Sequence, residues 1–142
     1  MIYGPYFPGS SPPLSALGLS PAQIYAMIDG SCTEVPSTRV PAYVDVRDVA
    51  TAHLKAFESE VSGRFLISAG RWNPQAACDF FRERFPERKG RIPEGVKGSE
   101  VDACVVDAGK SRSVLGVRYR SFEETFGDMG DAFVALEKEE SG

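Results

Sequence analysis

The stretch YVDVRDVA at 43–50 holds the most distinctive group of residues that could do chemistry. Asp45, Arg47 and Asp48 fall where an alternating apolar run gives way to a helical pattern. Charged side chains at such a junction either cap the helix and form a local ion pair, or contact a ligand. Capping with a local ion pair is the simpler interpretation, and ligand contact is the alternative.

A second stretch, DAGKS at 107–111, resembles the end of a phosphate-binding P-loop. That motif needs a glycine five residues before the Gly109–Lys110 pair, so that the backbone can curl around phosphate. Cys104 occupies this position. We therefore expect DAGKS to be the start of a helix, with Asp107 as its N-cap.

Nucleophilic and metal chemistry have few candidates in this chain. The single histidine, His53, lies on the apolar side of a predicted helix, and no G-x-S-x-G motif is present, so a structural histidine is favoured over a catalytic triad. Cys32, Cys78 and Cys104 are widely spaced, without a C-x-x-C pair, and are interpreted as buried small hydrophobes. No zinc-ligand spacing occurs.

Composition sets the class of protein. The chain has 142 residues, 42% of them hydrophobic and 25% charged, which is typical of a globular domain. A net charge of -4 argues against nucleic-acid binding and against an anionic membrane as a partner. No apolar run approaches the roughly 20 residues that span a bilayer, and no signal sequence follows Met1. A cytoplasmic location is the expectation.

The elements that must position these residues alternate between strand and helix, which predicts an α/β fold. The sheet seen in the sequence is incomplete, because only about four short strands are predicted. Residues 1–140 form a single partial domain and residues 138–142 a solvated tail. The expected strands cover 1–3, 42–46, 63–70 and 101–107, and the expected helices cover 20–29, with Gly30 ending that helix, 48–57, 73–85, 109–115 and 121–136.

Caps and apolar faces support the helices. Capping boxes are predicted at Ser20–Gln23 and Ser121–Glu124, and single N-caps at Asp48 and Asn73. Each helix then carries an apolar stripe that we expect to face the core. These stripes are Ile24, Tyr25 and Ile28; Val49, His53, Leu54 and Phe57; Ala77, Phe80, Phe81 and Phe85; and Phe122, Phe126, Met129, Phe133 and Leu136.

Taken in order, these stretches resemble the C-terminal half of extended short-chain dehydrogenases/reductases, in the NAD-dependent epimerase/dehydratase superfamily. The resemblance rests on MIYGP, YVDVRDVATAHLKAFE, GRFLISAG and a D-x-x-K-S-x-x-x-L-G segment, and it covers nearly the whole chain. Within the superfamily the chain is most similar to dihydroflavonol-4-reductase, cinnamoyl-CoA reductase and the methylglyoxal (aldehyde/ketone) reductases. The last segment consists of Asp107, Lys110, Ser111, Leu115 and Gly116.

The resemblance implies a fold, a cofactor and site residues. It implies the last strands of a Rossmann-type sheet, at Met1–Tyr3 and Phe65–Ser68, plus a small α/β substrate-binding subdomain, with the N-terminal dinucleotide-binding half missing. The implied cofactor is NADP(H), and the implied substrate is a small carbonyl compound. Met1 would lie beside the nicotinamide and the reacting carbonyl. The substrate-binding positions would be Met1, Tyr3, Tyr6, Phe7 and Tyr43.

The motifs that carry catalysis in this family are absent from the sequence. The glycines never form G-x-x-G-x-x-G, and none of the five tyrosines has a lysine four residues later. Only Tyr43 comes near, with Arg47 in that place. We therefore assign no catalytic residue. We expect the chain to be the substrate-side portion of an NADPH-dependent carbonyl reductase, inactive alone and not binding NADPH alone.

The alternative is a stand-alone, non-catalytic module of this fold that binds a small ligand or a protein. Either interpretation leaves a sheet edge exposed, which predicts self-association. Apolar residues in the first loop, among them Tyr6, Phe7 and Leu14, favour a medium-sized carbonyl compound as the family ligand.

Overall fold

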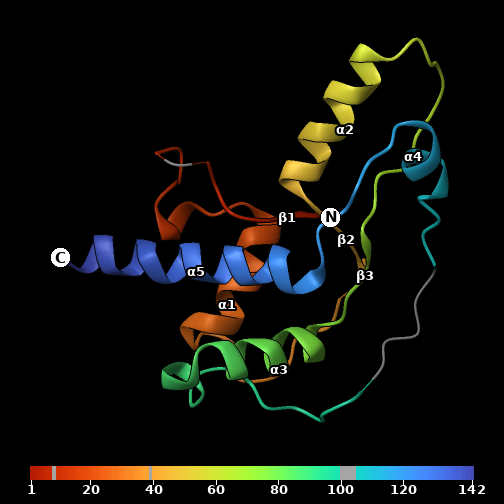
Figure 1. Cartoon of the computed structure of the whole chain (residues 1–142). Helices are drawn as coiled ribbons and strands as arrows, with labels where there is room; N and C mark the ends of the chain where they lie inside the picture. The colour runs from red at the N-terminus through yellow and green to blue at the C-terminus, as the bar shows by residue number, and fades with distance from the viewer. Residues whose placement is uncertain (8, 39, 100–104) are drawn as a thin grey trace.

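The computed structural model describes residues 1–7, 9–38, 40–99 and 105–142, and these form an α/β arrangement (Figure 1). The strands are β1 (Ile2–Tyr3), β2 (Ala42–Asp45) and β3 (Gly70–Arg71). The helices are α1 (Leu19–Asp29), α2 (Val46–Glu58), α3 (Pro74–Arg84), α4 (Gly109–Val114) and α5 (Phe122–Ser141). Two short 3-10 turns, η1 (Leu14–Ala16) and η2 (Pro86–Arg88), complete the elements.

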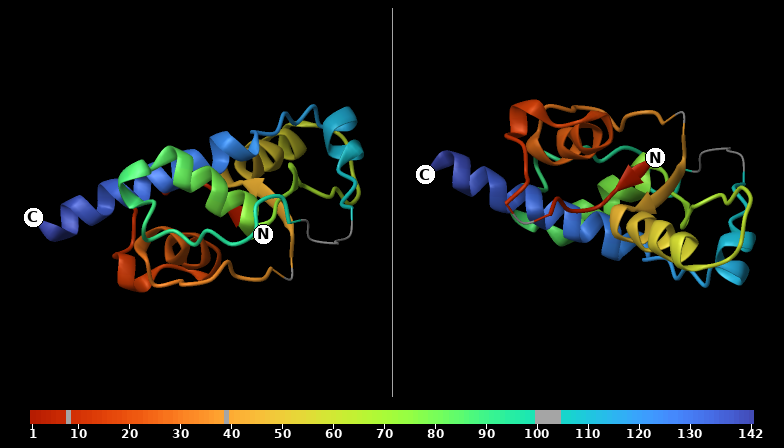
Figure 2. Two further views of the ribbon diagram at one scale, coloured as in Figure 1. Left: turned by 90° about the horizontal axis from the view of Figure 1, so that it is seen from below. Right: turned by 90° about the horizontal axis from the view of Figure 1, so that it is seen from above.

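The sheet has the order β1-β2-β3 and mixes two directions. β1 runs parallel to β2, with Ile2 opposite Val44, and β3 runs antiparallel to β2, with Gly70 opposite Tyr43. The predicted first two strands are thereby confirmed. The apolar core lies on one side of this sheet, where the long helix α5 runs across it and α1 and α3 both pack on α5 (Figure 2).

The predicted strand GRFLISAG is wrong over most of its length. Only its last residue, Gly70, lies in a strand. Phe65 and Ile67 instead pack against a small separate cluster around Ala52 and Leu115, next to α2 and α4. Their burial in that cluster draws the chain away from β2. Of the strand predicted over 101–107, residues 101–104 lie outside the described residues, and 105–107 are not in a strand.

The long helix α5 carries the main core stripe, as its spacing predicts. Phe126, Met129 and Phe133 are at most 1% exposed. Its predicted capping box is confirmed, because Ser121 Oγ accepts the Glu124 amide at 3.1 Å and Glu124 Oε2 accepts the Ser121 amide at 2.9 Å. The core around it is largely aromatic: Tyr3, Trp72, Phe81 and Phe85 join Ile24, Met27 and Ile28 from α1.

Helix starts follow the sequence in some places and depart from it in others. Asn73 caps α3 by accepting the Ala76 amide at 2.7 Å, as predicted. Ser20 does not cap α1, because that helix begins at Leu19 and its N-cap is Gly18, two residues before Ser20. Asp107 accepts the Gly109 amide at 2.7 Å, but the N-cap of α4 is Ala108. Both errors shift a boundary by one or two residues.

The predicted core face of α2 is wrong. Leu54 is 57% and Phe57 is 88% exposed, and His53 is also exposed. The buried face instead carries Asp48 and Ala52. An aspartate is seldom fully buried, so Asp48 did not mark its side of α2 as the core face. The apolar stripe on the other side was therefore predicted to face the core.

No described helix combines the length and the apolar character that a membrane span needs.

Candidate functional site

The parallel strands β1 and β2 end side by side, and a hollow lies just beyond their carboxyl ends. In open α/β sheets ligands bind in this place, because the loops that leave neighbouring strands diverge there. The hollow has a volume of about 380 Å³ and is lined mainly by apolar atoms. Its lining residues are Pro5, Tyr6, Phe7, Val46, Arg47 and Ala50.

A tight turn after β1 places the first three of these residues. Gly4 has a φ of +119°, in the region that favours glycine. A Cβ there would lie 3.2 Å from Asp45 Oδ1 and 3.2 Å from Val46 Cγ1. The turn therefore lies against the first residues of α2, and Pro5 leads the chain out of the sheet to form one wall of the hollow.

The charges at the floor of the hollow are already paired. Arg47 Nε donates to Asp45 Oδ1 at 2.8 Å, and its Nη atoms lie 2.7 Å from Asp45 Oδ2 and from Asp128 Oδ2. Burial raises the pKa of the Asp45 carboxyl, but hydrogen bonds from the Arg47 side chain and amide outweigh it and hold the pKa below its ordinary value. Arg47, the only cation among the described residues that line the hollow, is therefore neutralised by two carboxylates.

The capping interpretation of YVDVRDVA is confirmed, with a different residue as the cap. Asp45 caps α2 by accepting the Arg47 amide at 2.9 Å. Asp48 is not the cap. It is 1% exposed, accepts the Arg120 amide at 2.7 Å and pairs with the Arg120 guanidinium. The stretch thus ties the end of β2 to α5 and to the segment that precedes it.

The five predicted site residues fall in two different environments. Tyr6 and Phe7 line the hollow, and Phe7 is 80% exposed. Tyr3 and Tyr43 are buried in the aromatic core, where burial raises the pKa of both hydroxyls. Met1 is partly buried and packs against the same core.

The predicted site residues leave out four of the residues that line the hollow: Pro5, Val46, Arg47 and Ala50. The last three belong to YVDVRDVA, for which ligand contact was the alternative interpretation. Val46 and Ala50 are four residues apart on α2, so they share one helix face. Leu54 and Phe57 continue that face along α2, and the predicted stripe assigned both of them to the core, so the face was not recognised as a surface.

The other chemical candidates have structural roles. Ser111 is fully buried, donates to the Ala108 carbonyl at 2.7 Å and lies 2.6 Å from the Tyr119 hydroxyl. Lys110 lies over the Phe65 ring, 4.4 Å from its centroid. The Nδ1 atom of His53 is 2.8 Å from the Val49 carbonyl of its own helix. DAGKS therefore holds α4 in place and does not form a phosphate loop.

Among the described residues, no group of histidine, cysteine and acidic side chains could hold a metal ion. Cys78 is buried, as predicted, whereas Cys32 is partly exposed, and Cys104 lies outside the described residues.

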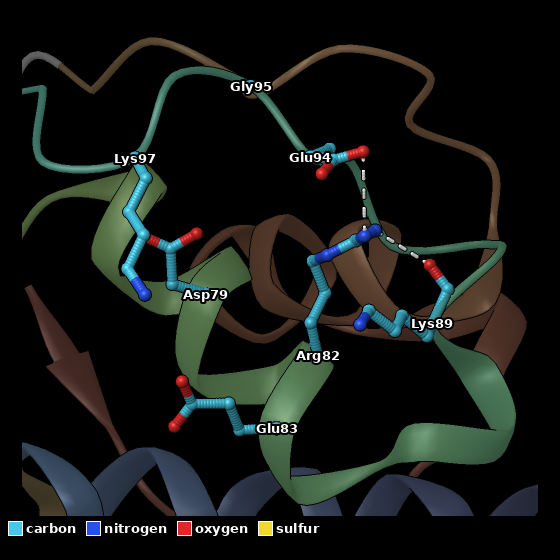
Figure 3. A pocket seen from close by; sticks show the side chains of 7 residues that line it. All are labelled: Asp79, Arg82, Glu83, Lys89, Glu94, Gly95 and Lys97. Atoms are coloured by element: carbon cyan, nitrogen blue, oxygen red, sulfur yellow. Dashed lines mark hydrogen bonds and ion pairs between the residues drawn. The ribbon is translucent and has the colours of Figure 1, made fainter.

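A second hollow, of about 320 Å³, is polar and lies on the outer side of α3 (Figure 3). Arg82 crosses it and donates to the carbonyls of Lys89 and Ile92 at 2.7 Å each. Its guanidinium also lies 3.6 Å from Glu94. These bonds fix the loop that follows η2, so Arg82 has a structural role there.

No protein-family model matches the chain. The Saccharomyces cerevisiae NADPH-dependent methylglyoxal reductase GRE2 is 35% identical over 112 residues, which cover 72% of this chain and 33% of the relative. A putative uncharacterized oxidoreductase of Schizosaccharomyces pombe is 32% identical over 139 residues, covering 96% of this chain and 40% of the relative. The Aspergillus niger ketoreductase azaE is 38% identical over 90 residues, covering 61% and 27%.

Solved structures agree with these relatives. The yeast methylglyoxal/isovaleraldehyde reductase Gre2 complexed with NADPH superposes with a TM-score of 0.80 at 29% identity, over 96% of this chain and 42% of that chain. Gre2 from Candida albicans in complex with NADPH superposes with a TM-score of 0.77 at 34% identity, over 95% of this chain and 41% of that chain. The chain therefore spans between a quarter and about two fifths of the length of the proteins it matches.

Proposed function

The chain belongs to the short-chain dehydrogenase/reductase family and spans part of the reductases it matches, and we propose that it forms the substrate side of an NADPH-dependent carbonyl reductase. The observation that supports this most directly is the apolar hollow at the carboxyl ends of β1 and β2. Its volume lies within the usual range of small-molecule sites, roughly 300–1,000 Å³. Tyr6 and Phe7, predicted as substrate-side residues, are both in its lining.

The lining favours an uncharged, mainly apolar carbonyl compound. Phe7, Val46 and Ala50 offer apolar contact, and Tyr6 adds an aromatic ring. An anionic substrate would gain little from Arg47, because Asp45 and Asp128 already neutralise its charge. In the proposed function these side chains bind and orient the substrate and exclude water from it. The predicted contacts of Met1, Tyr3 and Tyr43 with substrate remain proposals of the same kind.

The dinucleotide does not fit the residues present. Its pyrophosphate needs a glycine-rich turn and backbone amides at a helix start, and the sequence holds no G-x-x-G-x-x-G. Of the described residues in the lining of the hollow, Arg47 alone is a cation, and that cation is paired. We assign NADPH binding, and the catalytic tyrosine and lysine, to the portion of the relatives outside the match. Alone, the chain is proposed to be inactive, to self-associate through the β1 edge, and to be cytoplasmic.

A stand-alone binding module is the second candidate. The observation that favours it is the exposure of large apolar side chains on α2, because exposed apolar patches mark binding surfaces. Unlike the first candidate, such a module would bind its small ligand or protein partner without any further portion of the fold.

Ligand binding to the hollow tests the proposed function. We expect an apolar ketone such as acetophenone to shift the amide NMR signals of Phe7 and Ala50, and pyruvate, a charged keto acid, to leave them in place. Ala50→Trp should fill the hollow and weaken ketone binding by about tenfold or more, since a lost apolar contact of this size is worth at least about 1.4 kcal/mol.

Val114→Trp is the matched control, because Val114 is a half-exposed apolar residue of α4 outside the hollow. It should leave ketone binding unchanged. Equal binding of pyruvate and acetophenone, or an Ala50→Trp variant that binds the ketone normally, would remove the main support for a substrate site here.

A further inference from the structure

A hollow of about 540 Å³, here called the basic hollow, lies between the end of α1 and the loop that follows η2. Among the described residues that line it, three are cations, Arg82, Lys89 and Arg91. Its one carboxylate among those residues, Glu94, belongs to a side chain that is 83% exposed. Because the chain as a whole has a net charge of -4, the basic hollow is a local concentration of positive charge on an acidic protein.

The polar hollow on the outer side of α3 adjoins the basic hollow, since Arg82, Lys89 and Glu94 line both. In the polar hollow the described cations and carboxylates are equal in number: Arg82, Lys89 and Lys97 beside Asp79, Glu83 and Glu94 (Figure 3). The basic hollow has three cations to one carboxylate. Of the two, it is therefore the one whose charge favours an anion.

Arg82 offers the basic hollow a guanidinium that is already held in place. Its side chain is 14% exposed, and its Nη1 donates to the carbonyls of Lys89 and Ile92 at 2.7 Å each. Its Nη2 lies 3.6 Å from Glu94 Oε2, beyond hydrogen-bond distance, and makes no hydrogen bond with a described residue. The two carbonyls thus fix the group and leave the N–H bonds of Nη2 for a ligand. A group fixed in this way loses little conformational entropy on binding.

Lys89 and Arg91 add charge with which no described carboxylate pairs. Both residues are exposed, and neither side chain makes a hydrogen bond or an ion pair with a described residue. Glu137 acts on Arg91 only from beyond ion-pair distance and is itself paired with Arg88. The end of α1 accommodates the Arg91 side chain, because a Cβ at Gly30 would lie 3.3 Å from Arg91 Cβ.

The donors and the wall of the basic hollow indicate the class of ligand. A forked guanidinium beside ammonium and guanidinium charges is a donor set that suits phosphate oxygens. Thr33, also in the lining, carries a hydroxyl that can donate as well. Ile92, which is 2% exposed, and the buried Pro93 give the hollow an apolar wall. The volume leaves room for an organic group beside a phosphate.

We propose that the basic hollow binds the phosphate group of a small phosphate monoester through Arg82, Lys89 and Arg91, with the organic group against Ile92 and Pro93. This site shares no residue with the apolar hollow and goes beyond the proposed function. Water and salt screen the two exposed cations, so we expect a dissociation constant of about 1–10 mM at low ionic strength.

Amide NMR of this chain during titration with phenyl phosphate tests the proposal, at about pH 7.5, where the phosphate is a dianion, and at constant ionic strength. We expect saturable shifts at Thr33, Gly90 and Arg91. Inorganic phosphate should shift the same signals but bind at least about threefold more weakly, because it lacks a ring to contact the apolar wall. Equal affinity for the two ligands would overturn the assignment to a monoester.

Charge variants at exposed positions test the donors without disturbing the bonds of Arg82. Arg91→Gln and Lys89→Gln should each weaken the binding of phenyl phosphate by about fivefold, the effect of one unit charge at contact distance in water. Glu94→Gln removes the carboxylate from the lining and should strengthen binding by about twofold or more.

Arg118→Gln is the matched control, because Arg118 is exposed, has no ion pair with a described residue and does not line the basic hollow. It changes the net charge by the same amount and should leave the affinity unchanged. An equal loss in Arg118→Gln and Arg91→Gln, or shifts that sodium chloride reproduces, would indicate general attraction between charges and overturn the proposal. Shifts confined to Phe7 and Ala50 would place phenyl phosphate in the apolar hollow and overturn it too.

Discussion

Asp45 shows how one buried carboxylate organises the end of β2. It is fully buried, caps α2, and holds both the amide and the guanidinium of Arg47. Arg47 then reaches Asp128 on α5. A buried carboxylate is tolerated only when its charge is paired and its lone pairs are filled, and Asp45 meets both conditions.

We predict that Asp45→Asn lowers the free energy of unfolding at pH 7 by roughly 2 kcal/mol. This loss is smaller than for a fully buried ion pair, because the Arg47 side chain is 35% exposed and water screens its charge. The folded-state pKa of Asp45 lies below its ordinary value of 3.8, so its contribution is complete above about pH 3.8 and is lost as the pH falls through the folded pKa. Urea unfolding at several pH values measures this.

Asp128→Asn is the matched control for that experiment. Asp128 binds the same guanidinium but is 46% exposed, so its loss should cost well under about 1 kcal/mol. A difference between Asp45→Asn and the unmodified chain that stays constant down to pH 2 would show that folding leaves the pKa of Asp45 unchanged, and it would contradict the prediction.

For these residues the sequence predicted that a cap and an ion pair form, but it did not predict which aspartate makes which contact. YVDVRDVA indicated capping and an ion pair, which the structure confirms. Asp45 and Asp48 are both three or fewer residues from the helix start, so local pattern cannot tell which one caps. The choice depends on Arg120, which lies 72 residues later and takes Asp48.

Among the elements, the loop after η2 depends on one glycine. Gly95 has a φ of +57°, and a Cβ there would lie 2.1 Å from Gln75 Oε1 and 2.5 Å from Val35 Cγ2. Gln75 is 4% exposed and uses its amide to hold the Glu94 carbonyl and the Val96 amide on either side of this glycine. Close approach, and not only the backbone angle, therefore requires glycine at this position.

We predict that Gly95→Ala lowers the free energy of unfolding by about 2–3 kcal/mol, because the methyl group must displace buried Gln75 in addition to straining the backbone. Gly98→Ala separates the two effects, since Gly98 has a φ of +78° but no atom of the described residues outside its immediate neighbours lies within 4 Å of the added Cβ. It should cost only about 1 kcal/mol. Equal losses in thermal or urea unfolding would mean that crowding at Gly95 contributes nothing.

Elements with local signals were predictable, and elements defined by distant partners were not. The caps of α3 and α5 and the aromatic stripe of α5 follow from residues within a few positions of each other. GRFLISAG has strand composition, but β2 has only four residues and the small cluster around Leu115 takes Phe65 and Ile67 instead. The exposed face of α2 had the spacing of a core helix, and a sequence pattern alone cannot distinguish a buried apolar face from an exposed one.

At the scale of the whole molecule, the family was predictable because several weak motifs occur in a fixed order. A single short motif such as YGP can occur by chance. The occurrence of YGP, YVDVRDVA and D-x-x-K-S-x-x-x-L-G together, in this order, is what indicates the family. The hollow was predictable only in part. Tyr6 and Phe7 follow from the resemblance, whereas Val46 and Ala50 reach it because α2 turns its outer face toward the loop after β1.

The parallel edge of β1 and the apolar side of α2 are features of a fold whose relatives are more than twice as long as the part matched here. We propose that this chain supplies the substrate side and that another portion of the fold supplies the cofactor site.

Titration of NADPH, followed by its fluorescence, tests that proposal most directly when this chain is compared with yeast Gre2, whose solved structure holds NADPH. We predict a saturable change with yeast Gre2 and none with this chain up to about 100 μM, because a dinucleotide without its glycine-rich turn loses its pyrophosphate contacts. Saturable, micromolar binding of NADPH by the isolated chain would contradict the account.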